Sequence, residues 1–323
     1  MRLLVTGAGG FVGGHLLELV RREAPATRVY GVVQPHGSSR VAAPGARVLE
    51  ADLDDPQAAS ALIDEARPDA IVHLAGQSSV HQSWLDPGGT LRTNVLGIVH
   101  LLDAARRRGL APAVLVVGSA EEYGAVPESE LPIRETAPLQ PASPYAVSKV
   151  AQGALALLYG PKGGMRVVLT RTFHHTGPGR GEAFAESSFA RQIAEIECGL
   201  RAPVIDVGNL DAVRDFTDVR DVVRAYRLLL EKGEAGQAYN VCSGRGRRIR
   251  EVLDLLLAGS SVRVEVRVDK ERVRPSDVPA QVGDPSRVRA ATGWEPRIAL
   301  EQTLADLLSD WRARVAGTAG RSS

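Results

Sequence analysis

The stretch Leu3-Leu4-Val5-Thr6-Gly7-Ala8-Gly9-Gly10-Phe11-Val12-Gly13 decides the fold of this chain. Its first four residues predict a short buried strand, and the helical periodicity of residues 15–20 predicts a helix after the glycines. Gly7 permits a tight turn, Gly10 lets the backbone approach a pyrophosphate, and Gly13 lets helix and strand pack closely. The helix N-terminus then offers unpaired N–H groups to phosphate charge. A glycine cluster alone fits an ordinary turn, but the strand–glycine–helix order predicts a dinucleotide site that includes Phe11 and Val12.

A second motif, Pro144-Tyr145-Ala146-Val147-Ser148-Lys149, lies near the middle of the chain, and Ser119 precedes it in Gly118-Ser119-Ala120-Glu121-Glu122-Tyr123-Gly124. On a helix, Tyr145 and Lys149 share one face, one turn apart. The pKa of a free tyrosine is about 10, and a nearby ammonium lowers it. The pair can therefore exchange a proton with a sugar or alcohol oxygen. By itself the pair also fits a half-buried tyrosine covered by a lysine stem, so the glycine loop is what favours catalysis.

The first half of the chain alternates between strands and helices. Apolar runs predict strands at 2–6, 28–33, 46–50, 69–74, 113–118 and 166–172. Helical periodicity predicts helices at 10–23, 56–66, 86–108 and 144–160. This order predicts an α/β fold of the Rossmann type, a doubly wound parallel sheet with helices on both faces.

After residue 173 the pattern breaks into shorter pieces, with helices predicted near 182–199, 217–232 and 248–258. We therefore expect an NAD(P)-binding domain at 1–172, with sheet or helix returns near 204–232. A smaller C-terminal α/β substrate lobe is expected at 173–316. The tail at 317–323 is expected to be disordered.

Composition favours a soluble enzyme over a nucleic-acid or membrane protein. The chain has 323 residues, 44% of them apolar, which is enough for a sizeable core. A net charge of +1 produces no global field toward nucleic acid or an anionic membrane. The chain lacks a run of 18 apolar residues and a secretory signal, so cytoplasm is the expected location. Cys198 and Cys242 lack metal-ligand spacing, so no metal site is predicted.

The two motifs together resemble the extended short-chain dehydrogenase/reductase family, from residue 1 to about residue 312. The chain is most similar to the nucleotide-sugar branch, above all to GDP-6-deoxy-D-mannose reductases and next to GDP-mannose 4,6-dehydratases. This finer similarity rests on segments of the C-terminal half: Gly177-Pro178-Gly179, Val207-Gly208-Asn209-Leu210, Arg214-Asp215-Phe216-Thr217-Asp218, Tyr239-Asn240-Val241-Cys242-Ser243-Gly244, Arg274-Pro275-Ser276-Asp277 and Gly293-Trp294-Glu295-Pro296.

The resemblance implies a role for each residue of the catalytic motif. Ser119 hydrogen-bonds the sugar O4, Tyr145 transfers the proton, and Lys149 lowers the pKa of Tyr145 and holds the nicotinamide ribose. Hydride passes between the nicotinamide C4 and the sugar C4. Glu121 stands where dehydratases carry a glutamate that removes the C5 proton. Similar reductases also carry Glu-Glu-Tyr-Gly here, so Glu121 stays open between proton abstraction and substrate binding.

The same resemblance places further residues at the cofactor. Asp52 follows the third predicted strand and meets the adenine amine, although a helix-capping aspartate fits this position as well. Asn94 buttresses the active-site strands, unless it is only a polar residue on a helix surface. Cofactor contacts are also implied for Leu53, Leu74, Ala75, Gly76, Val117 and Phe173.

The residues that follow the second predicted strand help to distinguish NADP(H) from NAD(H) as the cofactor. The segment Val33-Gln34-Pro35-His36-Gly37-Ser38-Ser39-Arg40 has no acid that would bind the ribose 2′-hydroxyl and repel a 2′-phosphate. Arg40, with Ser38 or Ser39, is placed to meet a 2′-phosphate. This favours NADP(H), although a solvated loop arginine explains the residue nearly as well, so we expect NADP(H) or NAD(H).

Substrate contacts are implied at Ser78, which matches a hydroxyl-bearing position of the dehydratases, and at two arginines. A guanidinium suits a diphosphate because it donates in a planar fork, so Arg214 and Arg274 are candidates, with surface ion pairs as the alternative. Asp277 is expected to accept ribose hydroxyls. His174 replaces the family's usual asparagine, and an imidazole in place of that amide leaves the exact substrate open.

We therefore expect NAD(P)H-dependent reduction of the C4 keto group of GDP-4-keto-6-deoxy-D-mannose to GDP-D-rhamnose, in deoxysugar biosynthesis. The alternative is a GDP-mannose 4,6-dehydratase or another nucleotide-sugar epimerase or dehydratase, because the pattern Arg180-Gly181-Glu182-x-Phe184 resembles the dehydratases. A non-catalytic dinucleotide sensor is a third hypothesis, and the intact Ser119, Tyr145 and Lys149 set disfavours it.

Two predicted helices carry more apolar surface than packing on one sheet face requires. Helix 86–108 carries Leu91, Val95, Ile98, Val99 and Leu102, and helix 144–160 carries Val147, Val150, Ala154, Leu155, Leu157 and Leu158. Soluble monomers rarely expose a large patch of this kind. Similar enzymes pair these helices with their symmetry mates, so we expect a homodimer, unless the second lobe covers both helices.

Overall fold

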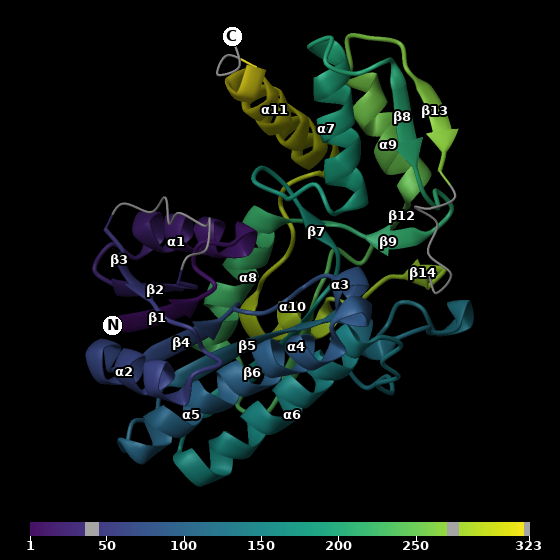
Figure 1. Ribbon diagram of the computed structural model, residues 1–323. Helices are drawn as coiled ribbons and strands as arrows, with labels where there is room; N and C mark the ends of the chain where they lie inside the picture. Colours follow the sequence, from purple (N-terminus) through teal and green to yellow (C-terminus); the bar gives the residue numbers. More distant parts are fainter. Residues whose placement is uncertain (36–44, 270–277, 320–323) are drawn as a thin grey trace.

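A seven-stranded parallel sheet with helices on both faces forms the centre of the molecule (Figure 1). The computed structural model describes residues 1–35, 45–269 and 278–319. The strand order β11-β6-β5-β4-β1-β2-β3 reverses between β4 and β1, which is the predicted doubly wound arrangement. The strands are β1 (Arg2–Thr6), β2 (Arg28–Val33), β3 (Arg47–Glu50), β4 (Ala70–His73), β5 (Ala113–Ser119), β6 (Arg166–Thr172) and β11 (Ala238–Val241). This topology predicts a ligand crevice at the carboxyl ends of β1 and β4.

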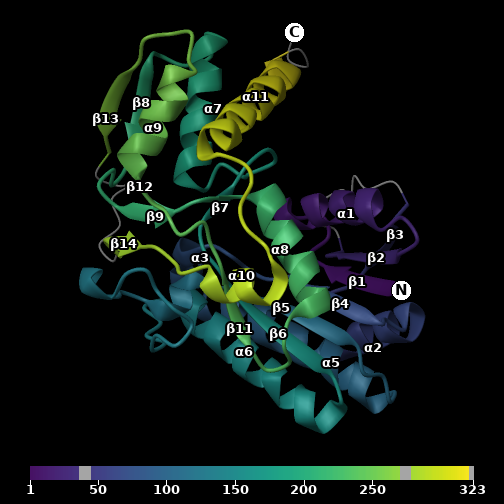
Figure 2. The same cartoon turned by 180° about the vertical axis from the view of Figure 1, so that it is seen from behind.

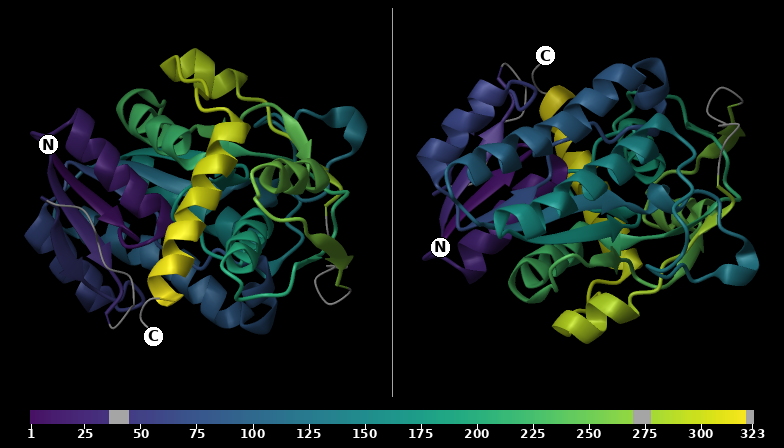
Figure 3. Two further views of the ribbon diagram at one scale, coloured as in Figure 1. Left: turned by 90° about the horizontal axis from the view of Figure 1, so that it is seen from above. Right: turned by 90° about the horizontal axis from the view of Figure 1, so that it is seen from below.

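Two apolar cores lie on the two faces of the sheet. On one face, α1 (Phe11–Glu23) and α8 (Val219–Lys232) pack side by side, with α10 (Ser286–Thr292) beside α8 (Figure 2). On the other face lie α2 (Pro56–Ala66), α5 (Gly97–Arg107) and α6 (Pro144–Gly163) (Figure 3). Strands that are buried on both faces have nearly continuous apolar sequences, and this pattern explains why the strands could be predicted accurately from the sequence.

The first-half elements agree with the sequence prediction, each predicted strand ending within one residue of the observed one. The strand that returns to the sheet from the second half is β11, which lies beyond the predicted return near 204–232. Within that range α8 returns to the sheet face, whereas β8 (Val204–Val207) pairs with β13 (Glu265–Val268) in the second lobe.

The predicted helix 86–108 is three successive pieces in the structure. A short helix α4 (Pro87–Leu91) leads into one wide π-turn (Arg92–Leu96), and α5 follows. A further short helix, α3 (Val80–Leu85), precedes them and was not predicted. The π-turn holds Asn94, whose side chain is occupied in tertiary hydrogen bonds. Such bulges are frequent at functional sites because they redirect one side chain of an otherwise regular helix.

The second lobe lies beyond the carboxyl ends of the sheet strands (Figure 1). Its core is formed by α7 (Ala185–Glu197), α9 (Ile249–Ala258) and α11 (Leu300–Ala319) against the β8–β13 pair. Short strands connect the two parts: β7 (His175–Thr176) with β10 (Thr217–Asp218), and β9 (Val213–Asp215) with β12 (Gly246–Arg248) and β14 (Ala280–Gln281).

Helix α11 extends to Ala319, so the first three residues of the predicted disordered tail are helical. Its inward side contributes Leu304, Leu307 and Leu308 to the core of the lobe. Across the described ranges, none of the helices combines the length and the hydropathy needed to cross a membrane.

Candidate active site

The loop between β1 and α1 has a geometry that only its glycines permit. Gly7 has a φ of +67°, and a Cβ on it would lie 2.9 Å from backbone atoms of Leu74 and Ala75. A Cβ on Gly13 would lie 2.4 Å from the carbonyl oxygen of Gly7. The N-cap residue of α1, Gly10, provides no side-chain cap, and the first turn has no acidic residue. The positive end of α1 and its N–H groups are therefore available to a phosphate, which fits a dinucleotide pyrophosphate.

The carboxyl end of β4 lies against this loop. The Thr6 hydroxyl accepts the backbone N–H groups of Leu74 and Ala75 at 3.2 and 3.1 Å, and it bonds His73 Nδ1 at 2.9 Å. Parallel pairing of β1 with β4 brings these residues together. The predicted cofactor residues Gly7, Leu74 and Ala75 thus lie together at the point where the strand order reverses, which is where folds of this type bind their ligands.

Asn94 fixes the segment that follows β4 to α6, the helix that carries Tyr145 and Lys149. Its Oδ1 accepts the N–H of Gln77 at 2.7 Å, and its Nδ2 donates to Gln77 O and to Ser148 Oγ. A Cβ on Gly76 would lie 2.8 Å from Asn94 Oδ1 and 3.7 Å from Lys149 Nζ. Asn94 is fully buried, so the alternative of a surface asparagine is wrong. The side chain acts as a buttress between the crevice and α6.

Ser119 and Tyr145 meet where β5 ends and α6 begins. Ser119 closes β5 and caps the one-turn 3₁₀ helix Ala120–Tyr123, whereas Ser143 caps α6 and Pro144 occupies its first turn. Tyr145 is 8% exposed. Burial raises the pKa of Tyr145 to about 12, against opposing effects from its hydrogen bond with Ser119 and from the Arg180 charge. The phenol is thereby held in the protonated, proton-donating form.

Lys149 lies one turn after Tyr145 on α6. Its ammonium donates to Val117 O at 3.0 Å and to Gln152 Oε1 at 2.8 Å. Burial lowers the pKa of Lys149 to about 8, and the Glu122 charge opposes this shift. The sequence predicted that Lys149 lowers the pKa of Tyr145. In the structure burial dominates and raises the Tyr145 pKa, so the net shift is opposite to the predicted one.

A third cation, Arg180, lies beside the N-terminus of α1 and was not assigned a role from the sequence. Its guanidinium lies 5.0 Å from the ring centre of Phe11, the first residue of α1, and 3.4 Å from that of Phe184. The Phe11 ring also stacks on His175 at 6.1 Å. The Arg180 charge lowers the pKa of Tyr145, so these residues connect the α1 N-terminus with the proton donor.

Of the predicted substrate residues of the second lobe, Arg214 lies on a short strand and His174 lies between β6 and β7. Arg214 on β9 is 9% exposed, donates to Val278 O at 2.7 Å, and stands in register with Gln281 of β14. The Gln281 amide donates at 3.1 Å to the carbonyl of Ala120, the residue after Ser119. The His174 ring lies 5.7 Å from the Phe216 ring, edge-on. The lobe therefore reaches the catalytic residues through β14.

Other predicted residues lie apart or outside the described structure. Asp52 is exposed, and Asp55 rather than Asp52 caps α2, so the capping alternative for Asp52 is wrong. Leu53 is 9% exposed, and its carbonyl bonds the His100 ring. Phe173 is buried beside Tyr123. Ser78 lies between β4 and α3, Val12 lies in the first turn of α1, and Glu121 lies on the 3₁₀ helix Ala120–Tyr123. Arg40, Arg274 and Asp277 lie outside the described residues.

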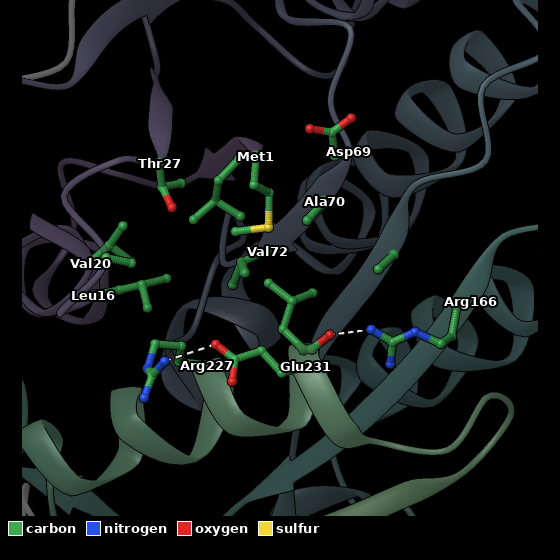
Figure 4. A pocket seen from close by; sticks show the side chains of 14 residues that line it. Met1, Leu16, Val20, Thr27, Asp69, Ala70, Val72, Arg166, Arg227 and Glu231 are labelled. Carbon is green, nitrogen blue, oxygen red and sulfur yellow. Dashed lines mark hydrogen bonds and ion pairs between the residues drawn. The ribbon is translucent and has the colours of Figure 1, made fainter.

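A cavity lies at the opposite edge of the sheet. It has a volume of 300 Å³ and opens between α1 and α8, at the amino ends of β1, β4, β5 and β6 (Figure 4). Aliphatic side chains such as Leu16, Val20 and Val72 line it, and the Arg227–Glu231 pair stands at its rim. The predicted site residues that the structure describes all lie elsewhere.

Sequence reasoning missed Glu122, Gln152 and Arg180, which all contact the catalytic residues or act on their charge. Glu122 and Gln152 fall at ordinary positions of their motifs, and only burial distinguishes them. The segment around Arg180 carried a signal in the sequence, because the two flanking glycines, Gly179 and Gly181, indicate a turn that holds the arginine.

The comparisons with known proteins agree with this geometry. The GDP-mannose 4,6 dehydratase family matches residues 4–307. The chain is 41% identical to GDP-6-deoxy-D-mannose reductase of Pseudomonas aeruginosa, over 97% of this chain and 98% of that relative. It is 28% identical to GDP-mannose 4,6-dehydratase of Yersinia enterocolitica, over 95% of this chain and 93% of that relative.

Solved structures show the same fold and cofactor class. RMD from Pseudomonas aeruginosa, complexed with NADPH, superimposes with a TM-score of 0.86 at 39% identity, over 97% of this chain and all of that one. UDP-glucose 4-epimerase of Thermus thermophilus, in complex with NAD, has a TM-score of 0.86 at 30% identity, over 97% and 99% of the two chains. The match over residues 4–307 and the 41% identity show that the chain belongs to the GDP-mannose 4,6 dehydratase family.

Proposed function

We propose that the protein reduces the C4 keto group of GDP-4-keto-6-deoxy-D-mannose to give GDP-D-rhamnose, with a reduced nicotinamide dinucleotide as hydride donor. The observation that carries this proposal is the 41% identity over 97% of the chain to a GDP-6-deoxy-D-mannose reductase. The Ser119–Tyr145–Lys149 arrangement supports it, because a carbonyl reduction needs a proton donor beside the oxygen that gains charge.

The residues divide the proton transfer between them. Ser119 donates a hydrogen bond to the C4 carbonyl oxygen and orients it toward Tyr145. Tyr145 then gives its phenolic proton to that oxygen as hydride from the cofactor reaches C4, so the carbonyl becomes an alcohol. A phenol with a raised pKa suits this direction, since it is fully protonated at neutral pH. Lys149 stabilises the resulting phenolate by its charge.

The chain fits a dinucleotide cofactor through the open N-terminus of α1 and the Gly7–Gly13 loop. We favour NADP(H) over NAD(H), because the segment after β2 lacks an acid and carries Arg40. The relative from Pseudomonas aeruginosa was solved with NADPH. Titration of the protein with NADPH and with NADH, followed by nicotinamide fluorescence, checks this choice: tighter binding of NADH would contradict it.

The test of function supplies purified protein with GDP-4-keto-6-deoxy-D-mannose and NADPH. We expect oxidation of NADPH that requires the keto sugar, and GDP-D-rhamnose as the product by chromatography and NMR. Absence of sugar-dependent oxidation would contradict the proposal. Each reaction is repeated with NADH, so that cofactor choice and activity are judged separately.

A GDP-mannose 4,6-dehydratase is the second candidate, and Glu121 is the observation in its favour. This carboxylate follows Ser119 by two residues, on the 3₁₀ helix beside the catalytic tyrosine, and its charge raises the Tyr145 pKa. A base at this position would remove the C5 proton of an oxidised sugar. Conversion of GDP-mannose to the keto sugar without added reductant would establish this activity instead.

We also propose a homodimer joined through α6 and the segment from α4 to α5. Five apolar side chains of these helices are exposed on the isolated chain: Leu91, Leu96, Val147, Leu155 and Leu158. The second lobe does not cover them, contrary to the alternative weighed from the sequence. A dimer would bury this surface and brace the helix that carries Tyr145 and Lys149. Location in the cytoplasm remains our expectation for an enzyme that uses a nucleotide sugar and NADPH.

Sedimentation at micromolar concentration tests the dimer. We expect a species of about twice the 34.4 kDa chain mass. Leu158→Glu should shift it to the monomer, because a charge would be buried in the interface. The matched control is Leu200→Glu, at a leucine that is equally exposed but lies in the second lobe. A wild-type species near the chain mass would rule the dimer out.

A further inference from the structure

Glu122 is a buried carboxylate directly beneath the catalytic serine. It is 5% exposed. Its Oε1 accepts the backbone N–H of Ser119 at 2.8 Å, which completes a capping box on the 3₁₀ helix that follows β5. The bond fixes the orientation of the last peptide of the strand, and Ser119 Oγ accepts the N–H of Glu121 at 3.2 Å. Glu122 thus controls where the serine hydroxyl stands.

The chain provides a niche that fits this carboxylate. A Cβ on Gly118 would lie 2.2 Å from Glu122 Oε1 and 2.5 Å from the carbonyl oxygen of Thr170. The backbone angles of Gly118 do not require glycine, since its φ is outside the left-handed region. The glycine is therefore needed for space, and the space is occupied by the Glu122 carboxylate. Burial of a charge in such a place is costly unless it has a function or a partner.

One partner is Arg171 on β6, whose Nε donates to Glu122 Oε2 at 3.1 Å. The guanidinium also donates to Tyr123 and to the carbonyl of Glu135, so it belongs to a network that extends away from the active site. The second charge near Glu122 is Lys149, whose ammonium bonds the carbonyl of Val117, two residues before the Ser119 that Glu122 holds. The Glu122 charge raises the pKa of Lys149 against burial.

We propose that Glu122 is a positioning residue of the reaction: it holds Ser119 at the sugar carbonyl and is the buried counter-charge of Lys149. The role rests on the reductase activity proposed above. Without the negative charge, Lys149 would lose its ammonium at a lower pH, and the phenolate formed on Tyr145 would lose its stabilising cation. Ser119 would also lose the bond that fixes its backbone.

Other charges around the pair set the sign of the expected pH effect. Glu121, like Glu122 itself, raises the pKa of Tyr145, and Arg180 lowers it. His73 faces Lys149 from β4, and burial lowers its pKa to about 3, so it is neutral. Removing Glu122 takes away the charge that raises the Lys149 pKa against burial, so that pKa falls further. The alkaline limb of activity must then move to lower pH.

The experiment compares Glu122→Gln with Arg171→Gln. Glutamine keeps an acceptor for the Ser119 N–H but removes the charge. The four lysines of the chain give four signals in ¹³Cε-lysine NMR, and Lys149→Arg identifies the one of interest. We expect the Lys149 midpoint, about 8 in the wild type, to fall by about 1 pH unit in Glu122→Gln and to rise in Arg171→Gln.

Kinetics supply the second measurement. In Glu122→Gln the alkaline limb of kcat should move down by about 1 pH unit, with KM for NADPH within about twofold of wild type. Glu122→Asp keeps the charge but is too short to reach the Ser119 N–H, so kcat should fall about tenfold with the limb unmoved. If Glu122→Gln does not fold, Glu122→Asp and Arg171→Gln still test whether Glu122 positions Ser119 and Lys149.

A merely structural ion pair would lower the melting temperature of each variant and leave the Lys149 midpoint and the alkaline limb unchanged, which overturns the proposal. The NMR titration needs no substrate. If the wild type fails to reduce the keto sugar, the proposed function is wrong, and the shift of the Lys149 midpoint still decides whether Glu122 faces this lysine as its counter-charge.

Discussion

The two edges of the central sheet differ in what they bury. At the carboxyl edge, Lys149, Glu122 and Arg180 are charged side chains less than a tenth exposed, and glycines bring backbone segments into contact. At the amino edge, aliphatic side chains surround a cavity of 300 Å³, and the charges stay at its rim (Figure 4). A cavity by itself would direct attention to the amino edge.

The geometry of a parallel sheet explains the difference between the two edges. A parallel sheet directs its strand ends and helix N-termini toward the carboxyl edge, so polar groups converge there. The amino edge receives the other ends of the helices, and its cavity is lined mainly by aliphatic side chains. We therefore expect substitutions at the carboxyl edge to change catalysis, and those at the amino edge to change only stability.

Tyr145→Phe should give the largest effect. Loss of the proton donor should lower kcat by about 10²-fold or more, since general acid catalysis contributes 10²–10⁴. Affinity for NADPH should stay within about twofold, because the ring and its packing remain. Steady-state kinetics and NADPH titration measure the two quantities. Near-normal turnover would show that another group delivers the proton.

Lys149→Met should lower both turnover and NADPH affinity, yet stabilise the fold at pH 7. The folded-state pKa of Lys149, about 8, lies below its ordinary value of 10.5. The unfolded chain therefore binds this proton more strongly, and stability from this group rises as pH increases from about 8 to 10.5. At pH 7 the buried charge costs about 1–3 kcal/mol. Urea unfolding at pH 7 checks the gain, and a loss of stability would contradict the sign.

Gly13→Ala should weaken NADPH binding by about tenfold or more and lower the melting temperature. The new Cβ would meet backbone atoms of Gly7 and Ala8 at 2.4 and 2.8 Å, which a side-chain rotation cannot relieve. Gly14→Ala is the matched control, because a Cβ at Gly14 meets nothing within 4 Å. It should gain about 0.5–1 kcal/mol from helix propensity and bind NADPH normally. If the two variants bind NADPH equally well, the loop between β1 and α1 does not belong to the cofactor site.

The sequence specified the sheet and most of the site because both depend on local patterns. Apolar runs defined β1 to β6 of the sheet, and the Gly7–Gly13 spacing defined the loop between β1 and α1. Ser119, Tyr145 and Lys149 were recognised through their spacing, and the structure brings them together at one strand end.

What the sequence did not specify depends on contacts between distant segments. The π-turn at Arg92–Leu96 follows from the bonds of Asn94 to Gln77 and Ser148, which no periodicity reveals. The raised pKa of Tyr145 follows from burial, whereas pair spacing alone suggested a lowered pKa. The role of Glu122 also depends on Arg171, which is 49 residues away along the chain.

Ala70→Val should give the smallest effect, and it tests the amino edge alone. Ala70 begins β4, is 2% exposed and lines the cavity between Leu3 and Ala113, its neighbours in the sheet (Figure 4). Two added methyl groups fit the vacant volume, and a β-branched residue suits a strand. Filling a cavity of this kind stabilises a protein by about 0.5–2 kcal/mol. Urea unfolding should show this gain while kcat and KM stay at wild-type values, because no described catalytic residue lines the cavity. A change in kcat or in NADPH affinity would show that the two edges are coupled, and that the amino-edge cavity influences the active site across the sheet.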